Sequence, residues 1–398
     1  MKYDFDTVIE RRSTDSLKWC RSRNGDALPM WVADMDFKVA PAILEAIIRR
    51  AEHGIFGYTA LSDEYFECII EHYRTRHDFR FERDDMMHVI GVVPALSACI
   101  RALCHPGDAV LIQTPVYNCF FSSIANHEIE AVHNPLRYRN GVWTMDLEDM
   151  EYKIRQLRPK LFILCNPHNP VGRVWTRHEL LQVAELCASY GVLIISDEIH
   201  NEITFPPHRY VPLGSLGPDV FENSITLISP SKAYNLASLQ MASVICGQYT
   251  TVQSVLKETF RISDISHVNP FGQVATIAAY TRSQDYLEQM LAYIWENYEY
   301  ARGYIAEHMP RIEVTQLEGT YLMLLNCRCF DTPSAELNVM LFRDYGLKLI
   351  AGDNYGEEGR GFLRMNLATQ RVRVREGLRR LQACYERHLR APPDAPVH

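Results

Sequence analysis

Three short apolar runs in the middle of the chain are each followed by a polar side chain of a different chemical kind. The runs span residues 161–164, 192–195 and 225–228. Their length and composition predict buried strands. Beyond them stand an amide, a carboxylate and an amine, on Asn169, Asp197 and Lys232. Because open α/β sheets bind ligands outside the carboxyl ends of their strands, we expect these three side chains to border a ligand cleft.

The segment between the first two strands has the pattern of a helix. Residues 176–179 have the spacing of a capping box, and the apolar positions that follow lie on one helical face that closes at Gly191. A helix over 177–190 would join strands at 160–165 and 191–197 into a βαβ unit. Such a unit requires a parallel strand pair and a right-handed crossover. The predicted fold class is therefore α/β, with a central, mostly parallel sheet.

Two strand ends further upstream offer additional groups. A strand over 86–90 turns at 91–94 into a helix expected over 95–103, and a junction of this kind leaves free backbone N–H groups for a phosphate. Tyr117 lies a few residues after a strand expected over 109–112. Packing and stacking on a ligand ring are equally compatible with an aromatic side chain at that point.

The lysine at the third strand end has a simple alternative explanation, because a lysine chosen at random is most often solvated on the surface. Two hydroxyl side chains close to Lys232 in the sequence, Ser229 and Ser231, suit an anionic ligand. Combined with Asn169 and Asp197, this position favours a binding site over a solvated loop.

Composition narrows the class of protein. Apolar residues make up 47% of the chain and charged residues 23%, which is ordinary for a soluble globular enzyme. The net charge of -8 argues against nucleic-acid binding. No apolar run is long enough to span a membrane, and the first residues lack a signal pattern, so we expect a cytoplasmic protein. Without a signal pattern, the 11 cysteines are expected to be reduced thiols, and because none form a Cys-x-x-Cys pair, we expect no metal site.

The length of 398 residues predicts more than one domain. We expect a large ligand-binding domain over 46–280 and a smaller α+β domain over 281–398, to which the N-terminal arm at 1–45 contributes. Residues 137–149 are polar and are predicted to form a loop.

Several motifs resemble one enzyme family. The order and spacing of Asn169, Asp197 and Lys232 are similar to those of the fold-type-I, pyridoxal-phosphate-dependent aminotransferases of classes I and II. Four further motifs resemble a narrower subgroup, the cystathionine β-lyase/cystalysin-type C–S lyases. They are WVADMDF at 31–37, GIFGY at 54–58, SDEIH at 196–200 and YGEEGRGF at 355–362. The resemblance covers nearly the whole chain and implies a homodimer with active sites at the subunit boundary.

The resemblance also implies roles around the cofactor, pyridoxal 5'-phosphate. Lys232 would carry the cofactor on its amine, and Asp197 would keep the ring nitrogen protonated. Asn169 would hydrogen-bond the phenolic oxygen of the ring, and Tyr117 would stack on the ring. His200 would also lie beside the cofactor.

At the other end of the cofactor, the resemblance implies a set of phosphate-binding groups. These would be the backbone N–H groups of Val92 and Val93, the hydroxyls of Ser229 and Ser231, and Tyr58 of the partner subunit.

The chain departs from the common aminotransferase pattern at four places. His200 stands where many members have a tyrosine, and Gln240 where many have a phosphate-binding arginine; both changes also suit the lyase subgroup. Ser238 replaces a glycine, and residues 323–326 replace a tryptophan-containing strand. These last two departures concern the substrate pocket.

The activity implied by the resemblance is α,β-elimination of cystathionine or a related cysteine S-conjugate, giving a thiol, pyruvate and ammonia. Arg364 would bind the carboxylate of this small amino-acid substrate, and Ala33 and the partner's Tyr58 would line its pocket. Lys232 would act as the general base at the α-carbon. Two alternatives stay open, an aminotransferase that uses the same site and a cofactor-binding regulator that acts by protein contact.

Overall fold

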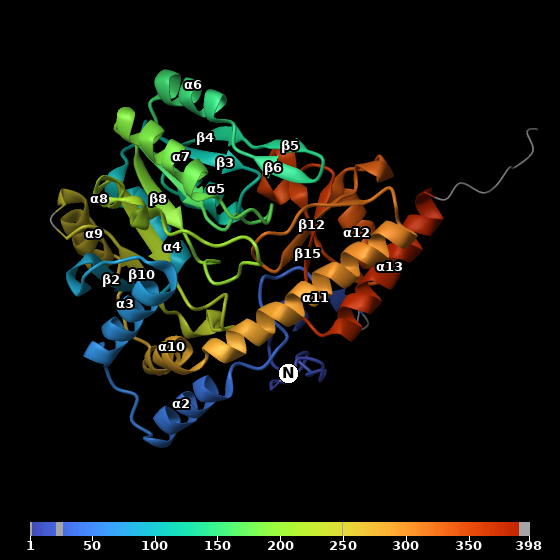
Figure 1. Cartoon of the computed structure of the whole chain (residues 1–398), viewed down its shortest axis with the longest axis horizontal. Helices are drawn as coiled ribbons and strands as arrows, with labels where there is room; N and C mark the ends of the chain where they lie inside the picture. Colours follow the sequence, from blue (N-terminus) through green and yellow to red (C-terminus); the bar gives the residue numbers. More distant parts are fainter. Residues whose placement is uncertain (1, 21–26, 249, 390–398) are drawn as a thin grey trace, which may run out of the picture.

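In the computed structural model, which describes residues 2–20, 27–248 and 250–389, the larger sheet has seven strands (Figure 1). They are β2 (Met86–Val89), β3 (Ala109–Thr114), β4 (Glu130–Pro135), β7 (Leu161–Cys165), β8 (Leu193–Asp197), β9 (Ser224–Ile228) and β10 (Ala242–Ile245). Their order across the sheet is β2-β10-β9-β8-β7-β3-β4. The contacts among β4, β3, β7, β8 and β9 are parallel, and only β10 runs against its neighbours. The predicted α/β class with a mostly parallel sheet is confirmed.

Helices cover both faces of this sheet, which explains why its strands are apolar throughout. Along β3, Val110 and Ile112 face one layer of helices, and Leu111 faces the other. The first layer contains α4 (Val92–Leu103), α5 (Asn118–Ala125) and α9 (Thr251–Ile262). The second contains α6 (Leu147–Leu157) and α7 (Arg177–Ser189). With both faces covered, the edge at the strands' carboxyl ends is left for ligand binding.

The predicted βαβ unit is present. Helix α7 begins with a capping box, in which the Thr176 hydroxyl accepts a hydrogen bond from the Glu179 N–H at 3.2 Å and the Glu179 carboxylate accepts one from the Thr176 N–H at 2.8 Å. The helix joins β7 to β8, which pair in parallel with Cys165 opposite Asp197. Local capping and the parallel pairing together bring Asp197 to the ligand-binding edge.

A second, four-stranded sheet lies on the right of Figure 1, in the order β11-β12-β15-β14. Its strands are β11 (Glu313–Val314), β12 (Leu322–Asn326), β14 (Ile350–Ala351) and β15 (Phe362–Asn366), and α12 (Ser334–Tyr345) and α13 (Arg371–Leu389) pack beside it. The short strand β1 (Leu28–Pro29) pairs in parallel with β13 (Leu347–Lys348), which ties the N-terminal arm to this half. The domain limits at 45 and 280 stay a prediction. Residues 1, 21–26 and 390–398 of the predicted N-terminal arm and smaller domain lie outside the described residues.

The remaining helices are α1 (Leu17–Cys20), α2 (Pro41–Glu52), α3 (Asp63–His77), α8 (Pro218–Glu222), α10 (Pro270–Arg282) and α11 (Gln284–His308). Of these, α2 and α10 lie at the lower edge in Figure 1, and α11 crosses between the two halves. Helix α10 packs against both α2 and α3, and α11 runs from α10 to α13. None of the described helices is long and apolar enough to cross a membrane.

Two local predictions are wrong. Residues 137–149 do not form a loop, because β5 (Arg137–Arg139) and β6 (Val142–Thr144) form a hairpin there and α6 begins at Leu147. The side chain of Asp146 caps α6 by accepting a hydrogen bond from the Asp149 N–H at 3.1 Å. The helix expected from residue 95 begins three residues earlier, at Val92, directly after Gly91.

Candidate active site

A cavity of about 630 Å³ opens at the carboxyl ends of β7, β8 and β9. Asn169, Asp197 and Lys232 all line it. Each follows or ends its own strand, and the three strands are neighbours in parallel. The structure therefore brings the predicted amide, carboxylate and amine into one site.

The Lys232 amine donates a hydrogen bond to the backbone carbonyl of Ala33 at 2.9 Å. The Tyr321 hydroxyl donates to the same carbonyl oxygen at 3.0 Å. Burial lowers the pKa of Lys232, and the positive charge of Arg364 lowers it further. Both effects favour the neutral amine that a nucleophile or general base requires.

The Asp197 carboxyl group is buried, and one of its oxygens accepts a hydrogen bond from the Ile199 N–H at 3.2 Å. Burial raises the pKa of Asp197 to about 6, against the opposing effects of that hydrogen bond and of Lys232. Among the described residues, no cationic side chain lies within ion-pair distance of this carboxylate. A cationic ring nitrogen would therefore supply a close ionic partner that none of the described side chains provides.

Arg364 projects from β15 of the smaller sheet and is buried in the same cavity. Its guanidinium donates to the Asn169 side-chain oxygen at 3.0 Å and to the Trp31 carbonyl at 2.8 Å. It also lies over the Tyr355 ring, 5.2 Å from the ring centre. Its Nε has no hydrogen-bond partner in the described structure. A guanidinium fixed in this way, with donor capacity left over, suits a carboxylate ligand.

The N-terminus of α4 also contributes to the lining of the cavity. Gly91, Val92 and Val93 line the cavity, and no side chain caps this helix end. Free N–H groups at a helix N-terminus bind phosphate. The side chains of Ser231 and Gln240, which are polar and uncharged, also line the cavity.

Most of the predicted site residues line this one cavity. They are Ala33, Val92, Val93, Tyr117, Asn169, Asp197, His200, Ser231, Lys232 and Arg364. Burial lowers the pKa of His200 well below its usual range, and the positive charges of Lys232 and Arg364 act in the same direction. The His200 Nδ1 atom has no hydrogen-bond partner among the described atoms, so it remains available to a ligand.

Two predicted residues lie elsewhere in the single chain. The Ser229 hydroxyl donates to the Met241 carbonyl at 2.7 Å and accepts from the Ser231 N–H at 3.1 Å, so it is occupied in holding the turn before Lys232. The Tyr58 side chain is fully exposed on the loop that follows α2. Since its predicted role belongs to the partner's site, that role stays a prediction.

Three aromatic residues of the site carried no predicted role. Trp31 and Tyr355 line the cavity, and Tyr321 reaches it through the Ala33 carbonyl. The Tyr355 hydroxyl is buried without a partner in the described structure. Trp31 and Tyr355 both lie in motifs that resemble the lyase subgroup, which is the signal that could have pointed to them.

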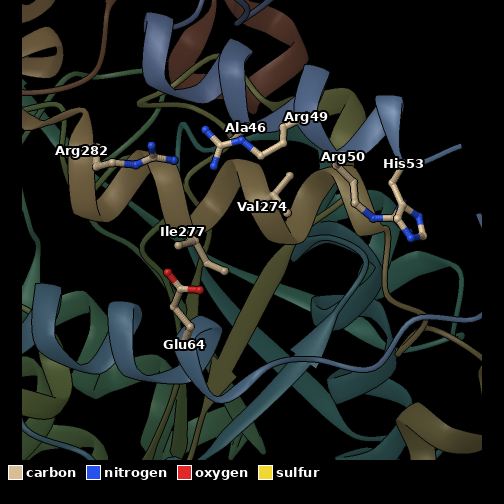
Figure 2. Close-up of a pocket in the computed structure, with 8 residues that line it drawn as sticks. All are labelled: Ala46, Arg49, Arg50, His53, Glu64, Val274, Ile277 and Arg282. Carbon is tan, nitrogen blue, oxygen red and sulfur yellow. The ribbon is translucent and has the colours of Figure 1, made fainter. Parts of the chain in front are cut away.

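A second cavity, of about 500 Å³, lies between α2 and α10 (Figure 2). Charged groups of Arg49, Arg282 and Glu64 surround an apolar wall to which Val274 and Ile277 contribute. None of the predicted site residues lines it. The cavity around Lys232 is therefore the candidate active site.

The residues of that cavity fit pyridoxal phosphate. An amine of lowered pKa suits its aldehyde, a buried carboxylate suits its ring nitrogen, and a helix N-terminus suits its phosphate. The Asn169 oxygen is used by Arg364, so its NH₂ group is the part available to the phenolic oxygen of the ring.

Comparison with known proteins gives one consistent result. Residues 28–381 match the family model for aminotransferase class I and II. Cystathionine beta-lyase PatB of Bacillus subtilis (strain 168) is 35% identical over 384 residues, which cover 96% of this chain and 99% of the relative. The structure of cystalysin from Treponema denticola, which contains pyridoxal 5'-phosphate, is similar with a TM-score of 0.94 and 28% identity, covering 97% and 100% of the two chains. The PLP-bound C-S lyase from Staphylococcus hominis, complexed with L-cycloserine, has a TM-score of 0.91 and 30% identity, with coverage of 97% and 100%.

Proposed function

The chain belongs to the class I and II aminotransferase family, and on that premise we propose that it is a pyridoxal-phosphate-dependent C–S β-lyase. Its substrate is cystathionine or a related cysteine S-conjugate. The conjugate and one water molecule are converted to a thiol, pyruvate and ammonia.

The observation that carries this proposal is the full-length similarity to a relative named cystathionine beta-lyase, combined with a cavity in this chain that is lined by Asn169, Asp197 and Lys232. The site contains a fixed guanidinium, Arg364, for the substrate carboxylate. Among the described residues lining the cavity, the other cationic side chain is Lys232, so no second arginine selects an acidic side chain. This favours a neutral substrate side chain over that of aspartate.

The cofactor, when bound, supplies an electron sink conjugated to the substrate's α-carbon. The protein supplies the positioning and the charges. Arg364 binds the substrate carboxylate through paired N–H groups and so fixes which bond at the α-carbon is aligned for cleavage. The Asp197 carboxylate would be the charge partner of the protonated ring nitrogen. Tyr117, at the N-terminus of α5, would pack beside the cofactor ring.

Lys232 moves the protons. Its Nζ, whose pKa is lowered by burial and by the positive charge of Arg364, takes the proton from the substrate's α-carbon. The same Nζ can then give a proton to the departing sulfur, so that a thiol is released. The Ala33 carbonyl, 2.9 Å from Nζ, holds the amine in place while it is free of other bonds.

An aminotransferase would use the same site, but its reaction requires a keto acid as a second substrate, whereas the lyase reaction does not. We expect the purified enzyme to release pyruvate and thiol from cystathionine steadily, with no keto acid added. Turnover that occurs only after a keto acid is supplied would assign the chain to the aminotransferases instead.

Two lysine variants test the residue assignment. Lys232→Ala should abolish pyruvate release, since no other described side chain in the cavity offers an amine. Lys257→Ala, an exposed position on α9, is the matched control and should retain activity. Full turnover by Lys232→Ala would show that the catalytic base lies elsewhere.

The proposal includes a homodimer with shared sites. Apolar side chains are exposed along α2 and its following loop: Leu44, Ile48, Ile55, Phe56 and Tyr58. The loop is nevertheless held in place, because Arg50 donates to the Ile55 carbonyl at 2.9 Å and the Phe56 ring lies 5.4 Å from that of Phe271. The cavity of Figure 2 adjoins the same helix, so a partner packed against α2 would cover part of it.

Mixing two inactive variants tests the shared site. In a dimer whose Tyr58 completes the partner's site, Lys232→Ala and Tyr58→Ala chains expressed together form hybrid dimers with one intact site. We expect activity above that of either variant alone, and light scattering should give the mass of two chains. A monomer, or no recovery of activity, would contradict the shared site.

The proposed location is the cytoplasm. It is consistent with free thiols at every cysteine whose side chain the structure describes. Cell fractionation tests it directly.

A further inference from the structure

A cluster of two histidines and a glutamate lies outside the active-site cavity. His72 and His77 project from α3, and Glu202 lies in the segment after β8. Both imidazole Nε2 atoms lie 2.7 Å from the same carboxylate oxygen, Oε1 of Glu202. The three side chains are 5%, 8% and 1% exposed. One carboxylate oxygen thus accepts two buried imidazoles, although no part of the proposed lyase mechanism uses them.

The three groups are the donor set that divalent transition metals prefer. Zn²⁺ binds imidazole nitrogen and carboxylate oxygen at about 2.0–2.2 Å, and sites with three protein ligands keep water as the fourth. The candidate ligand atoms of His72, His77 and Glu202 all lie within 4.8 Å of one another. Ligand atoms around a tetrahedral ion lie about 3.3 Å apart, so binding would require each nitrogen to move away from Oε1 by about 0.6 Å.

The surroundings also suit a bound ion. A cavity of about 380 Å³, lined by His77, Glu202 and Tyr210 among others, reaches the cluster and can supply both an entry path and the fourth ligand. The His77 ring packs edge-on against Tyr210, with 5.0 Å between centres, and the His72 ring lies 4.4 Å from that of Tyr280. These contacts hold both imidazoles with their Nε2 atoms toward Glu202.

One nearby cation needs to be considered. Arg76 forms an ion pair with Glu202, but its Nε lies 2.8 Å from the other carboxylate oxygen, Oε2, and leaves Oε1 to face the histidines. This ion pair orients the carboxylate with Oε1 toward the histidines, as outer contacts of metal-binding carboxylates do. The positive charge of Arg76 is also offset by Glu288, 3.9 Å from its guanidinium.

We propose that His72, His77 and Glu202 form a binding site for a divalent transition metal ion, with Zn²⁺ the best match. The site is separate from the lyase chemistry and does not depend on it. The ion would tie α3 to the segment 197–202, which carries Asp197 and His200 of the active site at its other end. Its expected effect is structural, by fixing that segment from behind. Cysteine spacing gave no reason to expect a metal site, because these ligands are histidines and a glutamate 125 and 130 positions apart in the chain.

Titration of the chelator-treated holoenzyme with Zn²⁺, followed by calorimetry, tests the proposal. We expect one ion per chain and a higher Tm with Zn²⁺ present. His77→Gln should weaken binding by more than about tenfold and remove the rise in Tm. His105→Gln, an exposed histidine beside Asp108, is the matched control and should bind like the unchanged protein.

Two further measurements keep the test decisive if a variant folds poorly. Co²⁺ in place of Zn²⁺ should give visible d–d absorption without the thiolate charge-transfer band that cysteine ligands would add. Crystals of the unchanged holoenzyme soaked in Zn²⁺ should show an anomalous peak among His72, His77 and Glu202. Absence of binding, equal binding by His77→Gln, a thiolate band, or a peak elsewhere would each overturn the site and leave a purely hydrogen-bonded cluster.

Discussion

Changing Asp197 to asparagine should stabilise the cofactor-free protein at neutral and alkaline pH, although it weakens cofactor binding. The carboxyl group is buried, and its pKa is raised from 3.8 to about 6 by that burial. The folded protein therefore binds this proton more tightly than the unfolded chain does. Stability from this group is greatest below pH 3.8 and is lost as the pH rises through about 6.

The magnitude follows from the two pKa values. Their difference, at 1.36 kcal/mol for each pH unit, amounts to about 3 kcal/mol at pH 8 and about half of that at pH 5. Unfolding entropy of about 2.1 cal/mol/K per residue over the whole chain converts about 3 kcal/mol to about 4 °C. Asparagine keeps the acceptor for the Ile199 N–H but carries no charge, so the variant should escape this cost.

Thermal unfolding of the cofactor-free proteins at pH 5 and pH 8, at equal concentration, measures the effect. Asp197→Asn should exceed the unchanged protein in Tm by about 4 °C at pH 8 and by about 2 °C at pH 5. Glu185→Gln removes an exposed carboxylate on α7 and is the matched control, with no comparable gain. In the same samples, cofactor affinity should fall at least about tenfold for Asp197→Asn, since the ring nitrogen loses its ionic partner. A gain in Tm that is absent at pH 8, or no larger there than at pH 5, would refute this account of Asp197.

Three other substitutions have defined outcomes. Arg364→Lys should raise KM for cystathionine by at least about tenfold, because lysine cannot offer paired donors to the carboxylate; an unchanged KM would place the substrate carboxylate elsewhere. Tyr321→Phe removes a hydrogen bond to the Ala33 carbonyl that is worth about 1 kcal/mol. It should lower kcat about fivefold and shift the pH profile of kcat. An unchanged profile would limit the hydroxyl to a packing role. Gly352→Ala should unfold at a clearly lower temperature, because an added Cβ would lie 1.9 Å from a backbone carbonyl oxygen. Gly303→Ala on α11, where nothing lies within 4 Å of the added atom, is its control and should be stabilised by up to about 1 kcal/mol.

Local sequence patterns determined the strand ends correctly and missed some elements between them. The apolar runs before Asn169, Asp197 and Lys232 form β7, β8 and β9, because a strand buried on both faces has to be apolar throughout. The hairpin of β5 and β6 was missed because strands of three residues are too short to show a period. Helix α6 was missed because its first turn is acidic and polar, although Met150 and Ile154 are buried below it.

Sequence by itself therefore determined the fold class and which side chains stand at the binding edge of the sheet. It did so because helical and strand periods, caps and the rule for parallel sheets act over short distances. Only the tertiary structure decided the hydrogen bonds that tune those side chains. Arg364 reaches Asn169 from 195 positions away, and Lys232 reaches the Ala33 carbonyl from 199 positions away. These contacts depend on how the two halves pack, and burial of the charged groups, which sets their pKa values, exists only once that packing is complete.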